Sequence, residues 1–223
     1  MLDMTAAILF LPLGGFVALG LVGRRLPRRL IALVGCGTVA ASFALAVVSF
    51  FALQSSRAPA HATLWTWVAS GQLTIPFGLM YDQLTAVMLL VVTGVGFLIH
   101  VYSVGYMEDD PGFWRYFAFL NLFIFTMVLL VTADNFLFLL VGWAGVGLAS
   151  FLLIGFWYTR PAAVAAAKKA FVVNVIGDFG LLLAIFLIAR TFGTLDFSGV
   201  LQYIPPGATG YAVPPLNSAG ETL

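Results

Sequence analysis

Residues 84–104 read LTAVMLLVVTGVGFLIHVYSV, a stretch that contains no Lys, Arg, Asp or Glu. A helix needs about 20 apolar residues to cross the hydrocarbon layer of a membrane. In lipid the backbone N–H and C=O groups find no water, so a helix, which pairs them within one segment, is favoured over an isolated strand. We therefore predict a membrane-spanning helix here.

Five more stretches have the same character. The six predicted spans are Thr5–Val22, Leu30–Leu53, Leu84–Val104, Trp114–Val131, Phe136–Trp157 and Ala170–Ala189. The composition agrees, because 62% of the 223 residues are hydrophobic and 9% are charged, whereas about a quarter of a soluble domain is charged. We predict an all-α membrane protein with about six transmembrane helices, and the composition excludes an ordinary soluble protein.

Charge bears on partners and on topology. The net charge of +1 gives no basic surface for nucleic acid, so the lipid bilayer and other membrane proteins are the expected partners. Short cytoplasmic loops hold most of the Lys and Arg of a membrane protein. Only Arg57 and Arg190 would fall on the face opposite to the first, third and fifth connections. Eight basic residues fall in the first, third and fifth connections: Arg24, Arg25, Arg28, Arg29, Arg115, Arg160, Lys168 and Lys169. This asymmetry predicts both termini on the outer face.

The second connection has strand character. Ala62–Val68 is followed by a Ser70-Gly71 break, and apolar residues then alternate with others from Leu73 to Leu79, which is typical of a surface hairpin. We divide the chain into a first helical pair (1–54), an external loop with this hairpin (55–83), a four-helix transmembrane bundle (84–193) and an external loop (194–223). The last segment is rich in Gly, Pro and small polar residues and ends as if cut within a longer protein.

The ionisable groups within the predicted spans are candidates for function, because such groups are costly at membrane depth. Asp178 lies in the sixth span, one turn after Asn174 on the same face. A proton or ion relay and a buried carboxylate that bonds a neighbouring helix are both compatible with this pattern. His100 lies late in the third span, where it would either titrate or be satisfied by one hydrogen bond between helices.

Lys168 and Lys169 stand at the start of the sixth span, where long side chains extend to the interface and such a structural role is the commoner one. Small residues at Gly142, Gly145 and Ala149 lie on one face of the fifth span and indicate close helix packing. A single cysteine and two separated histidines indicate no metal cluster.

The sequence between about residues 80 and 190 resembles a known family. The resemblance rests on YSVGYM at 102–107, FAFLNLFIFTM at 117–127, GW at 142–143, GVGL at 145–148, LLIGF at 152–156 and KAF at 169–171, followed by Asn174, Gly177 and Asp178. These motifs are similar to the N-terminal portion of the largest antiporter-like subunit, the chain 5 or subunit L type, of respiratory complex I, an NADH:quinone oxidoreductase.

The resemblance implies a bacterial inner-membrane subunit of that translocase, which contributes to or scaffolds a proton half-channel. The ionisable residues named above, Asp178, Lys169, Lys168 and His100, are the proton-path candidates. No cofactor is expected in this chain, whereas NADH, FMN, iron–sulfur clusters and quinone are expected in partner subunits. The partners would be other membrane-arm subunits of complex I.

Two positions depart from the family pattern. Where the family has Gly-Trp-Glu, this chain has Ala144 after the tryptophan, and where it has an arginine in the sixth helix, this chain has Val175. Loss of both charged residues together keeps the buried charges balanced, whereas loss of one alone would leave its partner unpaired. Asp178 would then lack an arginine in this chain and be protonated, or bonded to a neighbouring chain, at neutral pH.

Two further functions stay open beside the first. One is a subunit of a multi-subunit cation/proton antiporter or an inorganic-carbon uptake system, which share the fold. The other is a structural paralogue that keeps the helices but conducts nothing, because Ala144 cannot titrate.

Overall fold

The computed structural model describes residues 2–56, 60–70 and 73–202. Within these residues there are six long helices: α1 (Leu2–Val22), α2 (Arg28–Ser56), α3 (Gln83–Tyr106), α4 (Phe113–Thr132), α5 (Phe136–Ile154) and α6 (Pro161–Phe192). Each is long and apolar enough to cross a membrane. The remaining elements are the 3₁₀ turn η1 (Gly23–Arg25), strands β1 (Ala60–Ser70) and β2 (Leu73–Tyr81), and the short helix α7 (Phe197–Leu201). The predicted fold class, a helical membrane protein with a hairpin between its second and third spans, is confirmed.

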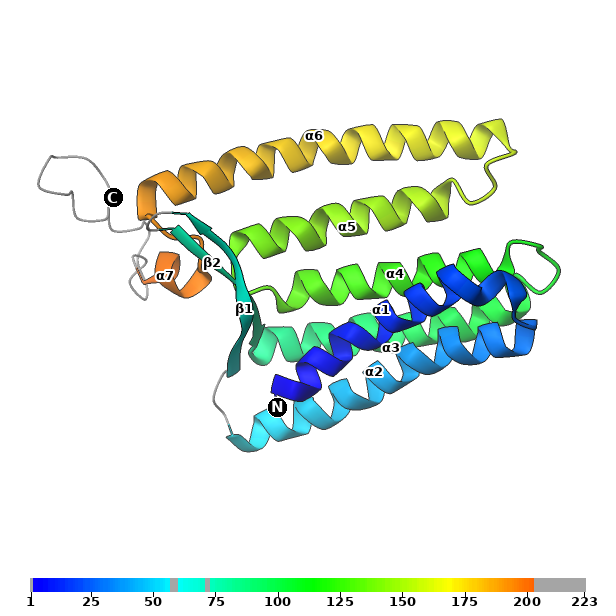
Figure 1. Ribbon diagram of the computed structural model, residues 1–223, viewed down its shortest axis with the longest axis horizontal. Coiled ribbons are helices and arrows are strands. Elements are labelled where there is room, and N and C mark those ends of the chain that lie inside the picture. Colours follow the sequence, from blue (N-terminus) through cyan, green and yellow to red (C-terminus); the bar gives the residue numbers. More distant parts are fainter. Residues whose placement is uncertain (1, 57–59, 71–72, 203–223) are drawn as a thin grey trace, which may run out of the picture.

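The long helices lie side by side along the long axis of the molecule (Figure 1). Helices α1 to α4 pack on one another, α5 packs on α4, and α6 packs chiefly on α5. The α1–α2, α3–α4 and α5–α6 connections lie at one end of the bundle, which we call the basic end, and the hairpin and α7 lie at the other (Figure 1). Most basic residues therefore gather at one end, as the predicted topology requires.

Local sequence explains where several helices begin and end. Asp82 caps α3 by accepting a hydrogen bond from the Thr85 N–H at 2.7 Å, and Asn135 caps α5 by accepting one from the Phe138 N–H at 2.9 Å. Such side chains satisfy backbone donors that a helix leaves unpaired at its start. Pro161 occupies the first turn of α6, and Gly193, with φ of 67°, ends it.

The hairpin is antiparallel, with Thr63 opposite Gly78 and Ser70 opposite Leu73. Its aromatic side chains attach it to the bundle, because Trp65 stacks on Phe77 and Phe77 contacts Phe138 of α5 edge to face, with both pairs of ring centroids 4.1 Å apart. Part of the predicted break at Ser70-Gly71 lies outside the described residues.

Three segments distant in sequence meet beside the hairpin. Leu79 of β2 forms a bridge with Ala133 at the end of α4, and Asn135 forms one with Asp196 before α7. The Phe136 N–H also donates to the Leu195 carbonyl at 3.0 Å. The segment predicted as an external loop from residue 194 thus begins with the helix α7, which the sequence analysis did not anticipate; residues 203–223 lie outside the described part of the chain.

The expected close packing at the small residues of α5 is confirmed. A Cβ atom added at Gly142 would lie 2.6 Å from the Leu130 Cα on α4, and one added at Gly145 would lie 2.6 Å from the Thr126 Cγ2. The backbones of α4 and α5 therefore approach closely because neither position carries a side chain.

At the basic end, Asp110 accepts a hydrogen bond from Trp157 Nε1 at 2.9 Å. This bond joins the α3–α4 connection to the α5–α6 connection.

Candidate functional site in the spanning helices

His100 of α3 is 1% exposed and lies among polar atoms of neighbouring helices. Its Nδ1 atom is 2.7 Å from the Gly96 carbonyl oxygen, and its Nε2 atom is 3.4 Å from Asn121 Nδ2 on α4. Asn121 is itself fully buried, and its Oδ1 atom accepts a hydrogen bond of 2.7 Å from the Thr38 hydroxyl on α2. We call Thr38, His100 and Asn121 the polar junction.

The hydrogen bonds of the polar junction fix the proton positions. The Gly96 carbonyl can only accept, so His100 Nδ1 carries a proton. Asn121 Nδ2 donates to the Phe117 carbonyl at 2.9 Å, so its amide nitrogen, rather than its oxygen, faces His100. His100 Nε2 then faces this amide nitrogen, which also donates to the Gly35 carbonyl at 3.4 Å. A second proton on Nε2 would face the amide donor of Asn121.

Two glycines let the helices approach around this junction. A Cβ atom added at Gly15 of α1 would lie 2.5 Å from Asn121 Oδ1 and 2.7 Å from Thr38 Oγ1. One added at Gly35 of α2 would lie 2.6 Å from the Phe117 Cδ1. The polar junction is therefore the place where α1, α2, α3 and α4 meet.

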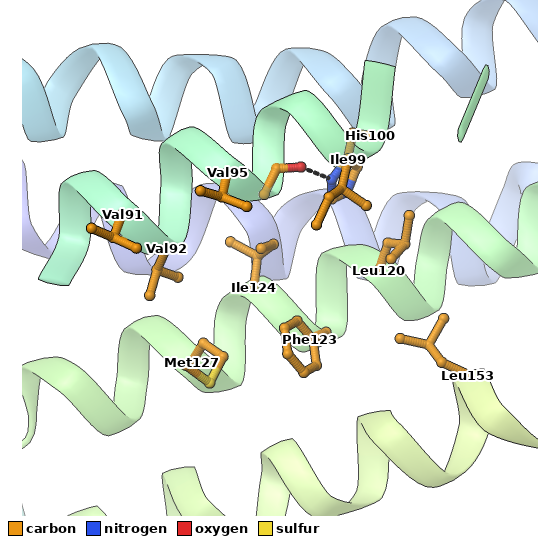
Figure 2. Close-up of a pocket in the computed structure, with 11 residues that line it drawn as sticks. Val91, Val92, Val95, Ile99, His100, Leu120, Phe123, Ile124, Met127 and Leu153 are labelled. Carbon is orange, nitrogen blue, oxygen red and sulfur yellow. Dashed lines mark hydrogen bonds between the residues drawn. The ribbon is translucent and has the colours of Figure 1, made fainter. Parts of the chain in front are cut away.

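On its other side His100 borders an apolar cavity of about 280 Å³ between α3, α4 and α5. Figure 2 shows the imidazole at one side of this space, with Val95 and Ile99 on its own helix, Phe123 on α4 and Leu153 on α5. Among the described residues that line the cavity, His100 alone is titratable. The imidazole thus lies between the polar junction and an apolar space.

Asp178 lies on the face of α6 that packs on α5. The buried residues Ala167 and Ile185 occupy the same face, three turns before it and two turns after it. Asp178 Oδ1 is buried and has no hydrogen-bond partner in the described part of the chain. Asn174, one turn earlier, lies beside Gly147 of α5, where an added Cβ would be 3.4 Å from its Nδ2 atom. The predicted polar stripe therefore faces a neighbouring helix.

Ala144 lies at the height of Asp178 on the facing helix. The Phe151 and Phe171 rings are 5.2 Å apart, and Gly147 lies beside Asn174, so these contacts set the register of the antiparallel pair. Ala144 lies about one turn from Gly147 on α5, and Asp178 lies about one turn from Asn174 on α6, in the same direction along the pair. The methyl group of Ala144 offers the Asp178 carboxyl no hydrogen bond, and Val175, one turn from Asp178, is 44% exposed and equally apolar.

Lys168 and Lys169 are both exposed near the start of α6. Lys168 borders a groove of about 280 Å³ that Arg115 and Tyr158 also line at the basic end. No hydrogen bond or ion pair links these lysines, His100 and Asp178 to one another among the described residues. The structure thus places the four sequence-predicted candidates in three separate regions: His100 at the polar junction, Asp178 on the side of α6 toward α5, and the two lysines near the start of α6.

Asn121 and Thr38 are the polar residues that the sequence analysis missed as site candidates. Asn121 stands in the apolar run at 117–127, which was used only for its resemblance to a family. An amide in the middle of a spanning helix was the signal that could have found it, because such a group needs partners inside the protein.

Comparison with protein families gives two matches on this chain. Residues 67–117 match the family described as NADH-ubiquinone oxidoreductase (complex I), chain 5 N-terminus, and residues 133–218 match NADH:quinone oxidoreductase/Mrp antiporter, TM. The two matches together cover the second strand of the hairpin, the polar junction residue His100, and the stripe that holds Asp178. The chain is therefore similar to complex I chain 5 over the first matched segment and to the NADH:quinone oxidoreductase/Mrp antiporter membrane domain over the second.

Curated relatives carry that family's names. NADH-quinone oxidoreductase subunit L of Mycobacterium tuberculosis is 47% identical over 204 residues, which are 90% of this chain and 32% of the relative. Subunit L of Escherichia coli K12 is 46% identical over 92% of this chain and 33% of its own length. NADH-ubiquinone oxidoreductase chain 5 of Rhizopus stolonifer is 42% identical over 91% and 31%. The chain therefore spans about a third of the length of the relatives it matches.

Solved structures agree on the fold. The Mrp complex from Dietzia sp. DQ12-45-1b superposes with a TM-score of 0.73 at 27% identity, over 88% of this chain and 20% of that one. An archaeal membrane-bound sulfane sulfur reductase superposes with a TM-score of 0.75 at 19% identity, over 86% of this chain and 38% of that one. The second likeness shows the fold alone.

Proposed function

We propose that this chain acts in the membrane arm of a proton-translocating NADH:quinone oxidoreductase, where it contributes to or scaffolds a proton half-channel. The identity of 46–47% to bacterial subunit L over nine-tenths of the chain carries this proposal. The buried polar groups of α3, α4 and α6 support it, because polar groups at membrane depth are retained where they serve charge movement or assembly. The 27% identity to the Mrp complex gives the antiporter alternative weaker support.

The expected setting follows from the same comparison. Other membrane-arm subunits would be its partners, and NADH, FMN, iron–sulfur clusters and quinone would bind to partner subunits rather than to this chain. We place the chain in the bacterial inner membrane with both termini on the outer face. The gathering of arginines and lysines at one end of the bundle supports that orientation. The division at residues 54, 83 and 193 remains a prediction.

Purification of the full protein from its membrane in mild detergent tests the assignment. We expect copurifying subunits that oxidise NADH with quinone, and proton uptake into vesicles when the complex is reconstituted. Recovery of a complex that exchanges cations for protons without NADH oxidation would instead support the antiporter function.

Thiol labelling tests the orientation. In a Cys36→Ala background, cysteines placed at Asp109 and Arg160 should be labelled from the same face of the membrane. Labelling from opposite faces would contradict the topology.

The surroundings of Asp178 support a second candidate function, that of a scaffold. Its buried Oδ1 atom lacks a partner in the described residues. Ala144, at the same height on α5, has a methyl side chain that can supply neither a proton nor a hydrogen bond. A proton path through this interface would need a group that can exchange a proton with Asp178. We infer that α5 and α6 conduct protons only if a neighbouring chain supplies that group, and that they otherwise hold the assembly together.

Restoring the two family residues separates conduction from scaffolding. In Ala144→Glu with Val175→Arg, the new glutamate lies at the height of Asp178 and the new arginine lies one turn from it, so the charges compensate one another. Proton uptake should rise relative to wild type if the rest of the path exists in the complex. Ala144→Glu alone is the matched control, because it adds an uncompensated carboxylate beside Asp178. Unchanged uptake in the double variant, with normal assembly, would identify a scaffold.

A further inference from the structure

A groove of about 580 Å³ opens between α2 and α3 at the basic end of the bundle. Arg28 and Arg29 line it from the first turn of α2, and Glu108 lines it from the connection that follows α3. Its volume is that of sites that hold small organic groups. Because both helices begin or end here, the groove lies at the level where a spanning protein meets the phospholipid headgroups.

The arginines of this groove are exposed and available. Arg28 lies over the Phe113 ring, with its guanidinium carbon 6.0 Å from the ring centroid. Neither Arg28 nor Arg29 forms an ion pair with a carboxylate in the described part of the chain. A guanidinium matches the geometry of a phosphate with two parallel hydrogen bonds. This end of the groove therefore suits a phosphate group.

The rest of the groove is apolar and open along the helices. Leu33 of α2 and Val104 of α3 form its walls, and Leu33 is 68% exposed. A Cβ atom added at Gly105 would have nothing within 4 Å in the described residues, so the groove keeps its depth beside this glycine. An acyl chain attached to a phosphate held by the arginines would lie along these walls and bury apolar surface.

Charge selects among phospholipids. Two arginines against one glutamate leave the lining with a net positive charge. A zwitterionic headgroup leaves that charge uncompensated, whereas a lipid with one net negative charge neutralises it. Glu108 on the opposite wall accepts hydrogen bonds, which suits a headgroup with free hydroxyl groups.

We propose that the groove between α2 and α3 binds one membrane phospholipid of the phosphatidylglycerol type, with its phosphate on Arg28 and Arg29, its headgroup hydroxyls toward Glu108 and an acyl chain along Leu33 and Val104. The lipid ties the start of α2 to the end of α3 and stabilises the basic end of the bundle. This site does not depend on proton movement and stands apart from the proposed function.

Native mass spectrometry of the full protein, delipidated in detergent and then titrated with phosphatidylglycerol, tests the site. We expect one retained lipid per chain. Arg28→Gln with Arg29→Gln should lower the affinity by about tenfold or more, since each basic residue near the surface contributes about 1 kcal/mol to anionic lipid binding. Gly105→Leu should abolish retention without a change of charge, because the added side chain fills the groove. Arg24→Gln with Arg25→Gln is the matched control, since it removes two charges of η1 that do not line the groove.

Four outcomes would contradict the proposal. The first is equal loss of lipid in the Arg24/Arg25 control, which would show general attraction to a basic interface. The second is equal retention of phosphatidylethanolamine by the wild type, which would remove the selection by charge. The third is full retention in Gly105→Leu, the variant whose folding is least at risk because its side chain points into open space. Displacement by glycerophosphoglycerol at similar concentrations would also contradict the role of the acyl chain.

Discussion

The Thr38 hydroxyl on α2 and the Asn121 side-chain oxygen on α4 form a hydrogen bond of 2.7 Å across 83 residues of sequence. Both side chains lie within apolar spans, where each would otherwise face lipid or hydrocarbon side chains. Asn121 then bonds the Phe117 carbonyl and approaches His100, so one amide joins three helices. Helix association in a membrane gains little from apolar contact alone, and a bond of this kind specifies which helices meet.

Thr38→Val should therefore destabilise the bundle. The substitution keeps the shape of the side chain and removes the donor to Asn121, at a cost of about 1 kcal/mol. Thr126→Val is the matched control, because the Thr126 hydroxyl bonds only carbonyls of its own helix, those of Leu122 and Phe123, among the described residues. Thermal unfolding in detergent should show a lower Tm for the first variant and a smaller change for the second. Equal shifts would show that the bond between helices adds nothing.

Gly15→Ala should destabilise the same region by a different mechanism. Its methyl group would lie 2.5 Å from Asn121 Oδ1 and would force α1 away from α2 and α4. Overpacking of this kind costs about 1–3 kcal/mol. Gly14→Ala provides the control, since its methyl group meets nothing within 4 Å in the described residues, and alanine is the better helix former. We expect a fall in Tm for Gly15→Ala and no fall for Gly14→Ala; a fall in both would contradict the assignment of crowding to Gly15.

The membrane helices could be predicted from the sequence because length and hydropathy determine them almost alone. The predicted span Leu84–Val104 lies within α3, which runs from Gln83 to Tyr106. The hairpin was visible for a similar reason, since alternation of side chains is a local property. The helix α7 was not, because its five residues carry no periodic pattern and its position depends on contacts with the start of α5.

The site was less accessible to sequence reasoning. Single ionisable residues such as Asp178 and His100 stand out in apolar helices, but the sequence does not tell which helices face one another. His100 and Asp178 were each predicted as proton-path candidates, and the fold places them in different parts of the bundle. Partners such as Thr38 and Asn121 are neutral and common in membrane helices, so only the packing reveals their role.

Asp134, which follows α4 outside the spanning segments, should make stability depend on pH. Burial beneath the hairpin raises the pKa of its carboxyl group from the ordinary value of 3.8, and the nearby Asp196 adds to this rise, while the hydrogen bond from Asn135 and the charge of His61 oppose it. An acid with a raised pKa in the folded state stabilises the fold fully at pH values below the unfolded pKa. That contribution is lost as the pH rises through the folded pKa. The stability that Asp134 contributes should therefore decrease as the pH rises above about 4.

Asp134→Asn isolates this effect because the amide oxygen can still accept the hydrogen bond from Asn135 but does not titrate. Measured from about pH 4 to about pH 8, the Tm of the wild type relative to the variant should decline as the pH rises. Other groups titrate in both proteins and cancel in the difference. A difference that stays constant over this range would show that Asp134 is not perturbed by the hairpin.

Gly78→Ala should detach the hairpin from the α4–α5 connection. Gly78 of β2 has the Asp134 carboxylate directly over its Cα atom, so a methyl group there overlaps that carboxylate. We expect a cost of about 1–3 kcal/mol and faster hydrogen exchange of the β2 amides. Adding Asp134→Ala removes the colliding atoms, so the double variant should recover protection relative to Gly78→Ala alone. Recovery identifies the collision as the cause, because a general loss of strand propensity at residue 78 would persist in the double variant; absence of recovery would mean that the carboxylate does not set the position of β2.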